Sequence, residues 1–114
     1  MPRSKKILSL RGTDDVIRKL RKDADMSLLK EAVRINTVEM NQAAQRSAPV
    51  DTGFLRRSIM MSIEDQGFSG HVNATANYAQ AVNDGTRHQK ANGFMTNAFY
   101  KQKVKFEQDL KRLI

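Results

Sequence analysis

The sequence contains no cysteine, and only two prolines and six glycines occur among its 114 residues. Without cysteine the chain can form no disulfide framework, no thiolate metal site and no cysteine nucleophile. It also lacks any apolar run long enough for a signal peptide or a membrane span. These absences favour a protein of a reducing, cytosolic setting that has no membrane partner.

Groups typical of catalytic or metal sites are equally scarce. His71 and His88 are the two histidines, and neither has the i,i+4 or Cys/His spacing of a metal site. Asp51, Thr52 and Ser58 contain nucleophile-like groups, but no histidine is near them in sequence and no nucleophile elbow is present. We therefore expect surface histidines and a protein that is not an enzyme, without catalytic residues, cofactor or metal.

The charge is strongly basic and is concentrated at the two ends of the chain. Lysine and arginine number 20 against 12 acidic residues, which gives a formal net charge of +8. Residues 1–22 carry +6, residues 101–114 carry +3, and the remainder carries −1. Such a field attracts polyanions without reading their sequence, although solvated basic helix faces would have the same composition.

The first half of the chain predicts a short strand and a long helix. Residues 7–10 form a β-like run, and residues 12–15 have the threonine and acids typical of a helix start. No glycine or proline interrupts the stretch from about Asp14 to Arg46, and Pro49 ends it. The pattern predicts a helix of roughly 30 residues, about 45–50 Å long at 1.5 Å per residue.

This long helix carries apolar residues on two separate faces. One face contains Ile17, Leu20, Ala24, Leu28, Ala32, Ile35 and Val38. The second face contains Met26, Leu29, Val33, Met40 and Ala44. Two interpretations stay open: the helix is enclosed within one domain, between a sheet and the last helix, or the second face is a subunit interface between copies of the chain.

The second half of the chain predicts a β-hairpin and a closing helix. Alternation from Leu55 to Glu64 and from Phe68 to Ala76, around a turn at residues 65–67, is typical of two antiparallel strands. Residues 78–82 fit a strand or a helical turn, and residues 85–93 have the composition of a mobile loop with little to anchor it. A last helix from about Met95 to Leu113 has an apolar stripe interrupted by Gln102. We predict an α+β fold in one domain, residues 1–114, with a long N-terminal helix packed on a small antiparallel sheet and a C-terminal helix.

Three segments carry a resemblance to a known family. They are AAQRSAPVDTGFLRRSI at residues 43–59, GHVNATANYAQAVNDGT at residues 70–86 and GFMTNAFYK at residues 93–101. In this order they resemble the signature segments of the small neck and tail-completion proteins of long-tailed double-stranded DNA phages and prophages. Members of the family often carry glutamate where Asn83 stands, and proline where Gly93 and Asn97 stand.

The resemblance implies a structural, non-catalytic virion protein that assembles as a hexameric ring in the neck or at the head-proximal end of the tail. Its implied partners are further copies of the chain, tail tube and head-connector proteins, and passing double-stranded DNA in non-specific contact. It implies a location in the virion, and in the host cytoplasm during assembly. In such a ring the N-terminal basic cluster is the candidate DNA-facing set, which contains Arg18, Lys19, Arg21 and Lys22.

The segment around Gly53 is best interpreted as a structural joint. Proline ends a helix, small polar residues hydrogen-bond in turns, and glycine adopts backbone conformations that other residues avoid. The predicted joint contains Pro49, Asp51, Thr52, Gly53 and Leu55, with Leu55 entering the strand.

Two other functions remain alternatives. A small basic nucleic-acid-binding regulator or packaging factor would explain the charge, but it would need a recognition helix or stacking aromatics among its basic residues. Only 6% of the residues are aromatic, and no helix-turn-helix spacing is evident. An antitoxin-like or chaperone-like protein that binds a partner is the third alternative.

Overall fold

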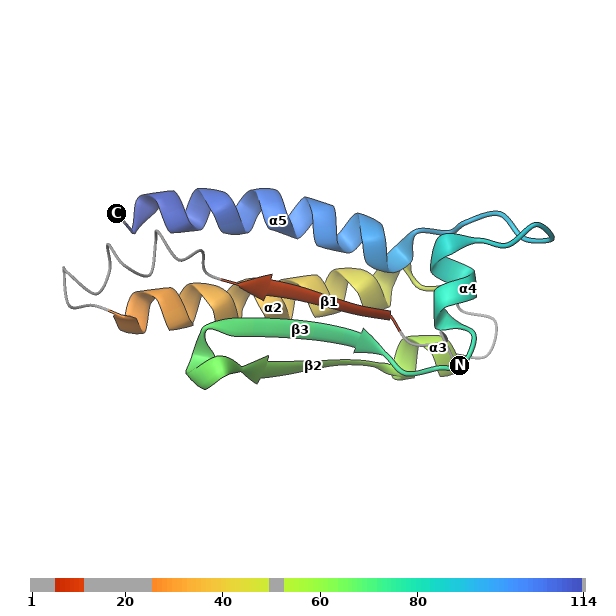
Figure 1. The fold of residues 1–114 in the computed structure, drawn as a ribbon, viewed down its shortest axis with the longest axis horizontal. Helices are drawn as coiled ribbons and strands as arrows, with labels where there is room; N and C mark the ends of the chain where they lie inside the picture. Colours follow the sequence, from red (N-terminus) through yellow and green to blue (C-terminus); the bar gives the residue numbers. More distant parts are fainter. Residues whose placement is uncertain (1–5, 12–25, 50–52, 114) are drawn as a thin grey trace.

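The computed structural model describes residues 6–11, 26–49 and 53–113. The two long helices and the strands lie side by side along the long axis of an elongated body, with α3 and α4 at one end (Figure 1). In chain order they are β1 (Lys6–Arg11), α2 (Met26–Ser47), α3 (Phe54–Arg57), β2 (Ile59–Glu64), the 3-10 turn η1 (Asp65–Gly67), β3 (Ser69–Ala74), α4 (Ala79–Asp84) and α5 (Phe94–Arg112). The predicted α+β class is confirmed. No helix in these described ranges has both the length and the hydropathy needed to cross a membrane.

The strands form an antiparallel sheet in the order β1-β3-β2. Val72 in the central strand lies opposite Leu8 of β1 and Met61 of β2. The predicted hairpin is confirmed, and its turn takes positive φ at Asp65, Gln66 and Gly67. The predicted N-terminal strand is confirmed, and it lies at one edge of the sheet, where it supplies the third strand that a stable hairpin needs.

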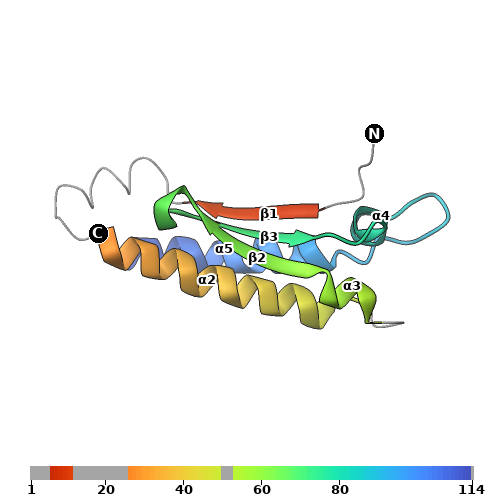
Figure 2. The ribbon, with the colours of Figure 1, turned by 90° about the horizontal axis from the view of Figure 1, so that it is seen from below.

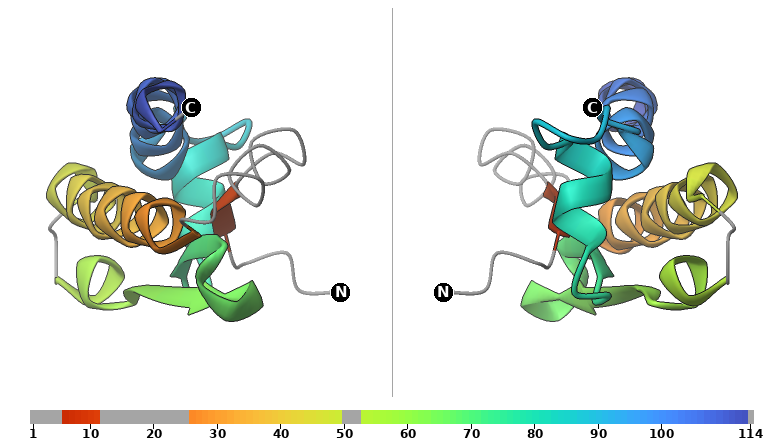
Figure 3. Two further views of the ribbon diagram at one scale, coloured as in Figure 1. Left: turned by 90° about the vertical axis from the view of Figure 1, so that its left-hand side faces the viewer. Right: turned by 90° about the vertical axis from the view of Figure 1, so that its right-hand side faces the viewer.

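The two long helices run along the sheet and cover one of its faces (Figures 2 and 3). Helix α2 packs against β2 and β3, whereas α5 packs against β1 and against α2. Predicted from apolar spacing, the C-terminal helix is confirmed within one residue at each end. The N-terminal part of the predicted long helix, from Asp14 to Asp25, lies outside the described residues.

The face of α2 that was a candidate subunit interface is the core of the monomer. Leu29, Val33, Met40 and Ala44 are fully buried against the sheet and α5, and Met26 packs partly buried against the same core. The interface prediction is therefore wrong, and the enclosed helix is the observed arrangement. The other apolar face is the more exposed one where it is described, with Leu28 50% and Ile35 40% exposed.

A glycine on the central strand sets how closely α2 approaches the sheet. A Cβ atom added at Gly70 would lie 1.7 Å from Oγ1 of Thr37, which is fully buried on α2. The Thr37 hydroxyl does not remain unsatisfied there, because it donates a 2.6 Å hydrogen bond to the carbonyl oxygen of Val33. Helix α2 and strand β3 are thus in contact through the side chain of Thr37 and the backbone of Gly70.

Candidate functional site

The segment that joins α2 to the sheet contains a short helix where a strand was expected. Gly53 has φ 73°, the left-handed conformation predicted for it, and it immediately precedes α3. The amide of Arg57 donates to the carbonyl oxygen of Gly53 at 3.1 Å, which closes the helical turn. Asp51 and Thr52 lie outside the described residues, so their predicted role in the turn stays a prediction.

The prediction that Leu55 enters the strand is wrong. Leu55 lies in α3 and is 3% exposed, and β2 begins only at Ile59. Ser58 is the C-terminal cap of α3, and its hydroxyl donates a 2.7 Å hydrogen bond to the carbonyl oxygen of Leu55. The carbonyl oxygen of Ser58 already accepts a hydrogen bond from the Thr75 amide at 3.1 Å, so pairing with the neighbouring chain segment begins directly after the helical turn.

The segment at residues 78–82, left open between strand and helix, is helical. Residues 79–82 belong to α4 (Ala79–Asp84), and Tyr78 precedes its first turn. The buried Asn83 links α4 to the start of α5. The Asn83 side-chain oxygen accepts hydrogen bonds from the amides of Met95 at 2.9 Å and Thr96 at 3.0 Å. These amides are among the unpaired donors of a helix N-terminus, so Asn83 caps α5 from a neighbouring element. The neck proteins that this chain resembles often have glutamate at this position, and a carboxylate oxygen can accept the same hydrogen bonds.

The ends of α2, α3 and α4 surround an apolar pocket of about 530 Å³. We call it the signature pocket, because most of its lining belongs to the first two signature segments; it is lined by Pro49, Gly53, Phe54, Leu55, Tyr78, Val82 and Gln89. At its rim the rings of Phe54 and Tyr78 lie 6.2 Å apart, inclined by 38°. Phe54 remains 51% and Tyr78 42% exposed. Large aromatic side chains left in water beside an apolar hollow indicate a surface for association.

Sequence reasoning missed Phe54 and Tyr78. Phe54 was treated as part of a connector, and Tyr78 fell in a segment whose structure was left open. The available signal was that each aromatic lies inside a signature segment, in the dipeptides Gly53-Phe54 and Asn77-Tyr78. Their proximity could not be anticipated, because 23 residues separate them along the chain.

A polar network lies between α2 and α5. Asn36 is fully buried; its amide donates to the Asp109 carboxylate at 2.9 Å, and its side-chain oxygen accepts from Gln102 at 2.5 Å. Gln102 and Lys105 both reach Glu39, at 3.0 Å each. These groups satisfy one another across the helix pair, which is the arrangement of a structural seam rather than of an open reaction site.

Two charged members of this seam, Lys105 and Asp109, have shifted pKa values. The hydrogen bond to Glu39 raises the pKa of Lys105. Partial burial of the Asp109 carboxyl favours its neutral form, but the hydrogen bonds from Asn36 and Lys105 outweigh this and lower its pKa. Both shifts stabilise the charged forms that hold the helices together.

The two histidines lie in different places in the fold and have different partners. His71 lies on the face of β3 away from the core, where its Nε2 is 2.9 Å from the Glu64 carboxylate and 3.2 Å from the Ser69 hydroxyl. His88 lies exposed in the loop between α4 and α5 and accepts a 3.3 Å hydrogen bond from Arg87. Among the described residues no three His, Asp or Glu side chains are grouped so that they could hold a metal ion.

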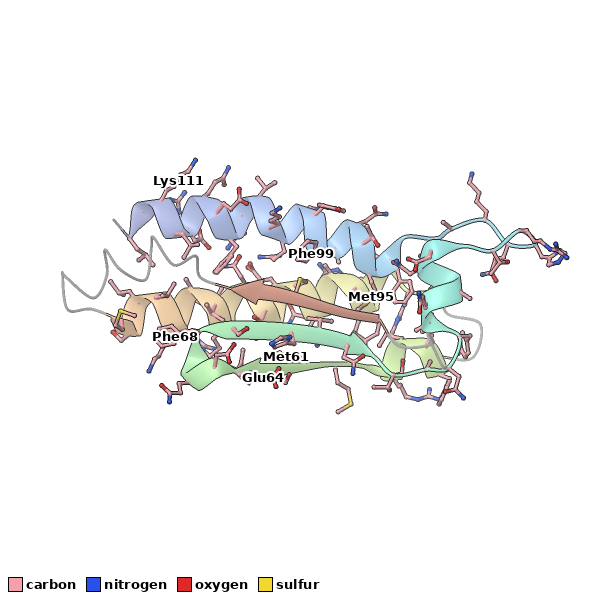
Figure 4. All side chains as sticks on the ribbon, in the orientation of Figure 1. Met61, Glu64, Phe68, Met95, Phe99 and Lys111 are labelled. Carbon is pink, nitrogen blue, oxygen red and sulfur yellow. The ribbon has the colours of Figure 1, made fainter. Side chains whose placement is uncertain are left out.

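The candidate DNA-facing cluster of Arg18, Lys19, Arg21 and Lys22 lies outside the described residues, so its placement stays a prediction. Within the described part of the chain, basic side chains gather on α5 and on the loop that precedes it. Nitrogen-bearing side chains project from both in Figure 4.

One family model matches the chain, over residues 13–85, and its description is "Bacteriophage HK97-gp10, putative tail-component". The match includes the first two signature segments almost entirely and ends at Gly85, before the third. No curated protein and no solved structure matches the chain. Because the match spans more than half of the chain, the protein belongs to the HK97-gp10-like family of phage tail components.

Proposed function

We propose that this chain is a structural subunit of the phage neck or of the head-proximal end of the tail. Identical subunits assemble into a ring, hexameric in its closed form, which completes the tail or joins it to the head and lets DNA pass. The tail tube and head-connector proteins are its proposed neighbours. Membership of a tail-component family supports the structural role.

The observation that carries the proposal is the signature pocket. The segments that resemble the neck family come together at one end of the molecule, where they leave two aromatic rings in solvent instead of shaping a polar catalytic cleft. Aromatic residues contribute strongly to protein interfaces when they become buried. We assign this end to the contact between subunits, in place of the α2 face that the fold buries.

Solution mass tests the ring. The chain mass is 12.9 kDa, so a ring gives several-fold this mass by light scattering and a central hole in electron micrographs. The variant Phe54→Ser with Tyr78→Ser is expected to be folded but monomeric, because both side chains are exposed in the subunit. Tyr100→Ser with Val104→Ser is the matched control: it removes two exposed apolar side chains from α5 and is expected to keep the ring.

Three outcomes would count against this function. A wild-type protein that stays monomeric both alone and with purified tail tubes contradicts the ring. Equal loss of assembly in both double variants contradicts the assignment of the contact to the signature pocket. Tight, sequence-selective DNA binding by a monomer or dimer would favour the regulator instead.

A further inference from the structure

The loop between α4 and α5, residues 85–93, is a braced arm. It extends beyond the rest of the body at one end of the long axis (Figure 1). Thr86 and Gln89 exchange backbone hydrogen bonds of 2.8 and 3.2 Å across its tip. Its base is tied to α4 by the amides of Asn92 and Gly93, which donate to the carbonyl oxygens of Val82 and Asn83. The expectation of little anchoring is therefore wrong for the backbone of this loop.

The two limbs of the arm also touch at its base. Gly85 has φ 80°, and a Cβ atom added there would lie 2.8 Å from the backbone nitrogen of Ala91. Glycine thus permits a close approach of two backbone segments that a larger residue would separate. The hydrogen bonds and this contact together hold the tip in a defined position.

The tip carries positive charge, and the carboxylate nearest to it in sequence is Asp84, at the end of α4. Arg87, His88 and Lys90 are all exposed. No aspartate or glutamate occurs anywhere in residues 85–106. Within the described part of the chain, neither Arg87 nor Lys90 forms an ion pair with a carboxylate. On α5, in contrast, Lys105 is paired with both Glu39 and Asp109.

We propose that the tip of this arm contacts the phosphate backbone of double-stranded DNA through Arg87 and Lys90. The inference rests on the proposed function, in which DNA passes the ring. When they meet phosphate, these cations on a projecting arm break no ion pair with a carboxylate, and the one hydrogen bond at stake is the exposed 3.3 Å bond from Arg87 to His88. They gain from the release of condensed counterions. Because the family match ends at Gly85, the basic tip lies beyond the part of the chain that the family model describes.

The contact is non-specific in character. Arginine and lysine on a short hairpin turn supply charge and hydrogen-bond donors to phosphate oxygens, whereas sequence is read by side chains that reach base edges in a groove. The arm therefore guides or holds DNA of any sequence, and the interaction is strongly salt-dependent.

The test compares two double variants that lose equal charge. Arg87→Gln with Lys90→Gln removes the cations of the arm, and Lys101→Gln with Lys103→Gln removes two exposed cations from α5 as the control. Binding of each protein to a fluorescent 30-base-pair duplex of random sequence is followed by anisotropy between 50 and 200 mM salt. Circular dichroism of each variant verifies the fold, and light scattering on the same samples reports assembly.

Each lost phosphate contact lowers the salt slope by about 0.9, so the arm variant is expected to lose about 1.8 per bound subunit. Over this fourfold change in salt, the fold-loss of affinity is then expected to be about ten times larger for the wild type than for the arm variant. The control is expected to keep the wild-type slope.

Unchanged binding by the arm variant would overturn the inference, as would an equal effect of both variants, which indicates a diffuse field. Sequence-selective binding that resists salt would also overturn it. The inference would also be overturned by an arm variant that binds DNA normally but no longer joins purified tails. That result would indicate that the arm contacts an acidic protein surface instead of DNA. If the wild type forms rings but the arm variant keeps the wild-type salt slope, only this inference is refuted. If DNA binding depends on the arm but no rings form, only the proposed function is refuted.

Discussion

Replacing Gly70 by alanine tests the packing of α2 on the sheet. The new methyl carbon would lie 1.7 Å from Oγ1 and 2.9 Å from Cβ of Thr37. A rotation of the Thr37 side chain would move Oγ1 away and break its hydrogen bond to Val33, but it would leave Cβ in place. Because Cβ is fixed to the helix backbone, α2 or β3 must shift to accept the methyl group.

The magnitude follows from two opposing effects. Gly70 does not need a positive φ, so alanine lowers the entropy of the unfolded chain and contributes about 0.4–1 kcal/mol of stability. Overpacking of a well-packed contact typically costs about 1–3 kcal/mol, and here the displaced element is a long helix rather than a flexible side chain. The cost of the clash is the larger effect. We therefore expect the free energy of unfolding to fall by about 1–2 kcal/mol, or the melting temperature by roughly 4–8 °C for a domain of this size.

Urea and thermal unfolding of four proteins measure the effect: wild type, Gly70→Ala, Thr37→Ala and the double variant. Thr37→Ala deletes Oγ1 and Cγ2, so it relieves the closest contact while the Cβ contact remains. The double variant is therefore expected to recover part of the loss, with a coupling energy of about 0.5–3 kcal/mol. A fully stable Gly70→Ala variant, or strict additivity of the two changes, would refute the close approach of α2 and β3.

Four further predictions follow from the same structure. Gly53→Ala should lower stability by about 1–2 kcal/mol because φ is 73°, and Gly53→Asn should lose less because asparagine tolerates this region; comparing their melting temperatures checks this. Asn83→Ala should cost about 0.5–2 kcal/mol and speed hydrogen exchange at the first amides of α5, whereas unchanged exchange would argue against the cap. The lowered pKa of Asp109 contributes stability that is present above about pH 4 and is lost as the pH falls through the folded value, so acid titration of Asp109→Asn should show a weaker dependence in that window. Met40→Glu should abolish helical circular dichroism rather than yield a folded monomer, because this side chain is fully buried.

The elements that sequence predicts well are those whose period is unambiguous. Alternation over residues 59–64 and 69–74 can bury one face only as strands, and the glycine-containing turn between them fixes the hairpin. The stripe of α5 likewise includes Gln102 as its one polar position, and the structure buries that residue in hydrogen bonds to α2. In these elements local preference and tertiary packing agree.

Prediction failed where two structures satisfy the same local pattern. The alternation of Leu55, Arg57 and Ile59 fits a strand. However, Gly53 is left-handed and Ser58 caps the turn that follows it, so residues 54–57 form a helical turn and the strand begins at Ile59. On α2, the two apolar faces have equal periodicity, so nothing local decides which one is buried. The decision comes from partners remote in sequence, such as Gly70, whose missing side chain admits the face that carries Thr37.

The signature pocket could be predicted only in part, for the same reason. Resemblance identified the segments that build it, but the pairing of Phe54 with Tyr78 depends on α3 and α4 lying together at one end of the fold. The charge of the arm is visible in the sequence, whereas its bracing is not. Backbone hydrogen bonds from Asn92 and Gly93 to α4 exist only because α5 begins beside α4.

The distribution of exposed apolar side chains limits how copies of this chain can associate. Phe54 and Tyr78 lie at the signature pocket, whereas Leu28 and Ile35 lie on α2. If the signature pocket met its own copy, the contact would be isologous and would stop at two subunits. A ring requires the pocket of one subunit to meet a different surface of the next, because only such a heterologous contact can repeat and close. Leu28→Ser with Ile35→Ser therefore separates the cases: it should break a ring in which this face of α2 is the complementary surface, yet leave an isologous dimer intact. If the wild type has a solution mass of two chains and the variant keeps that mass, the ring is refuted, even if the signature pocket forms the contact of the dimer.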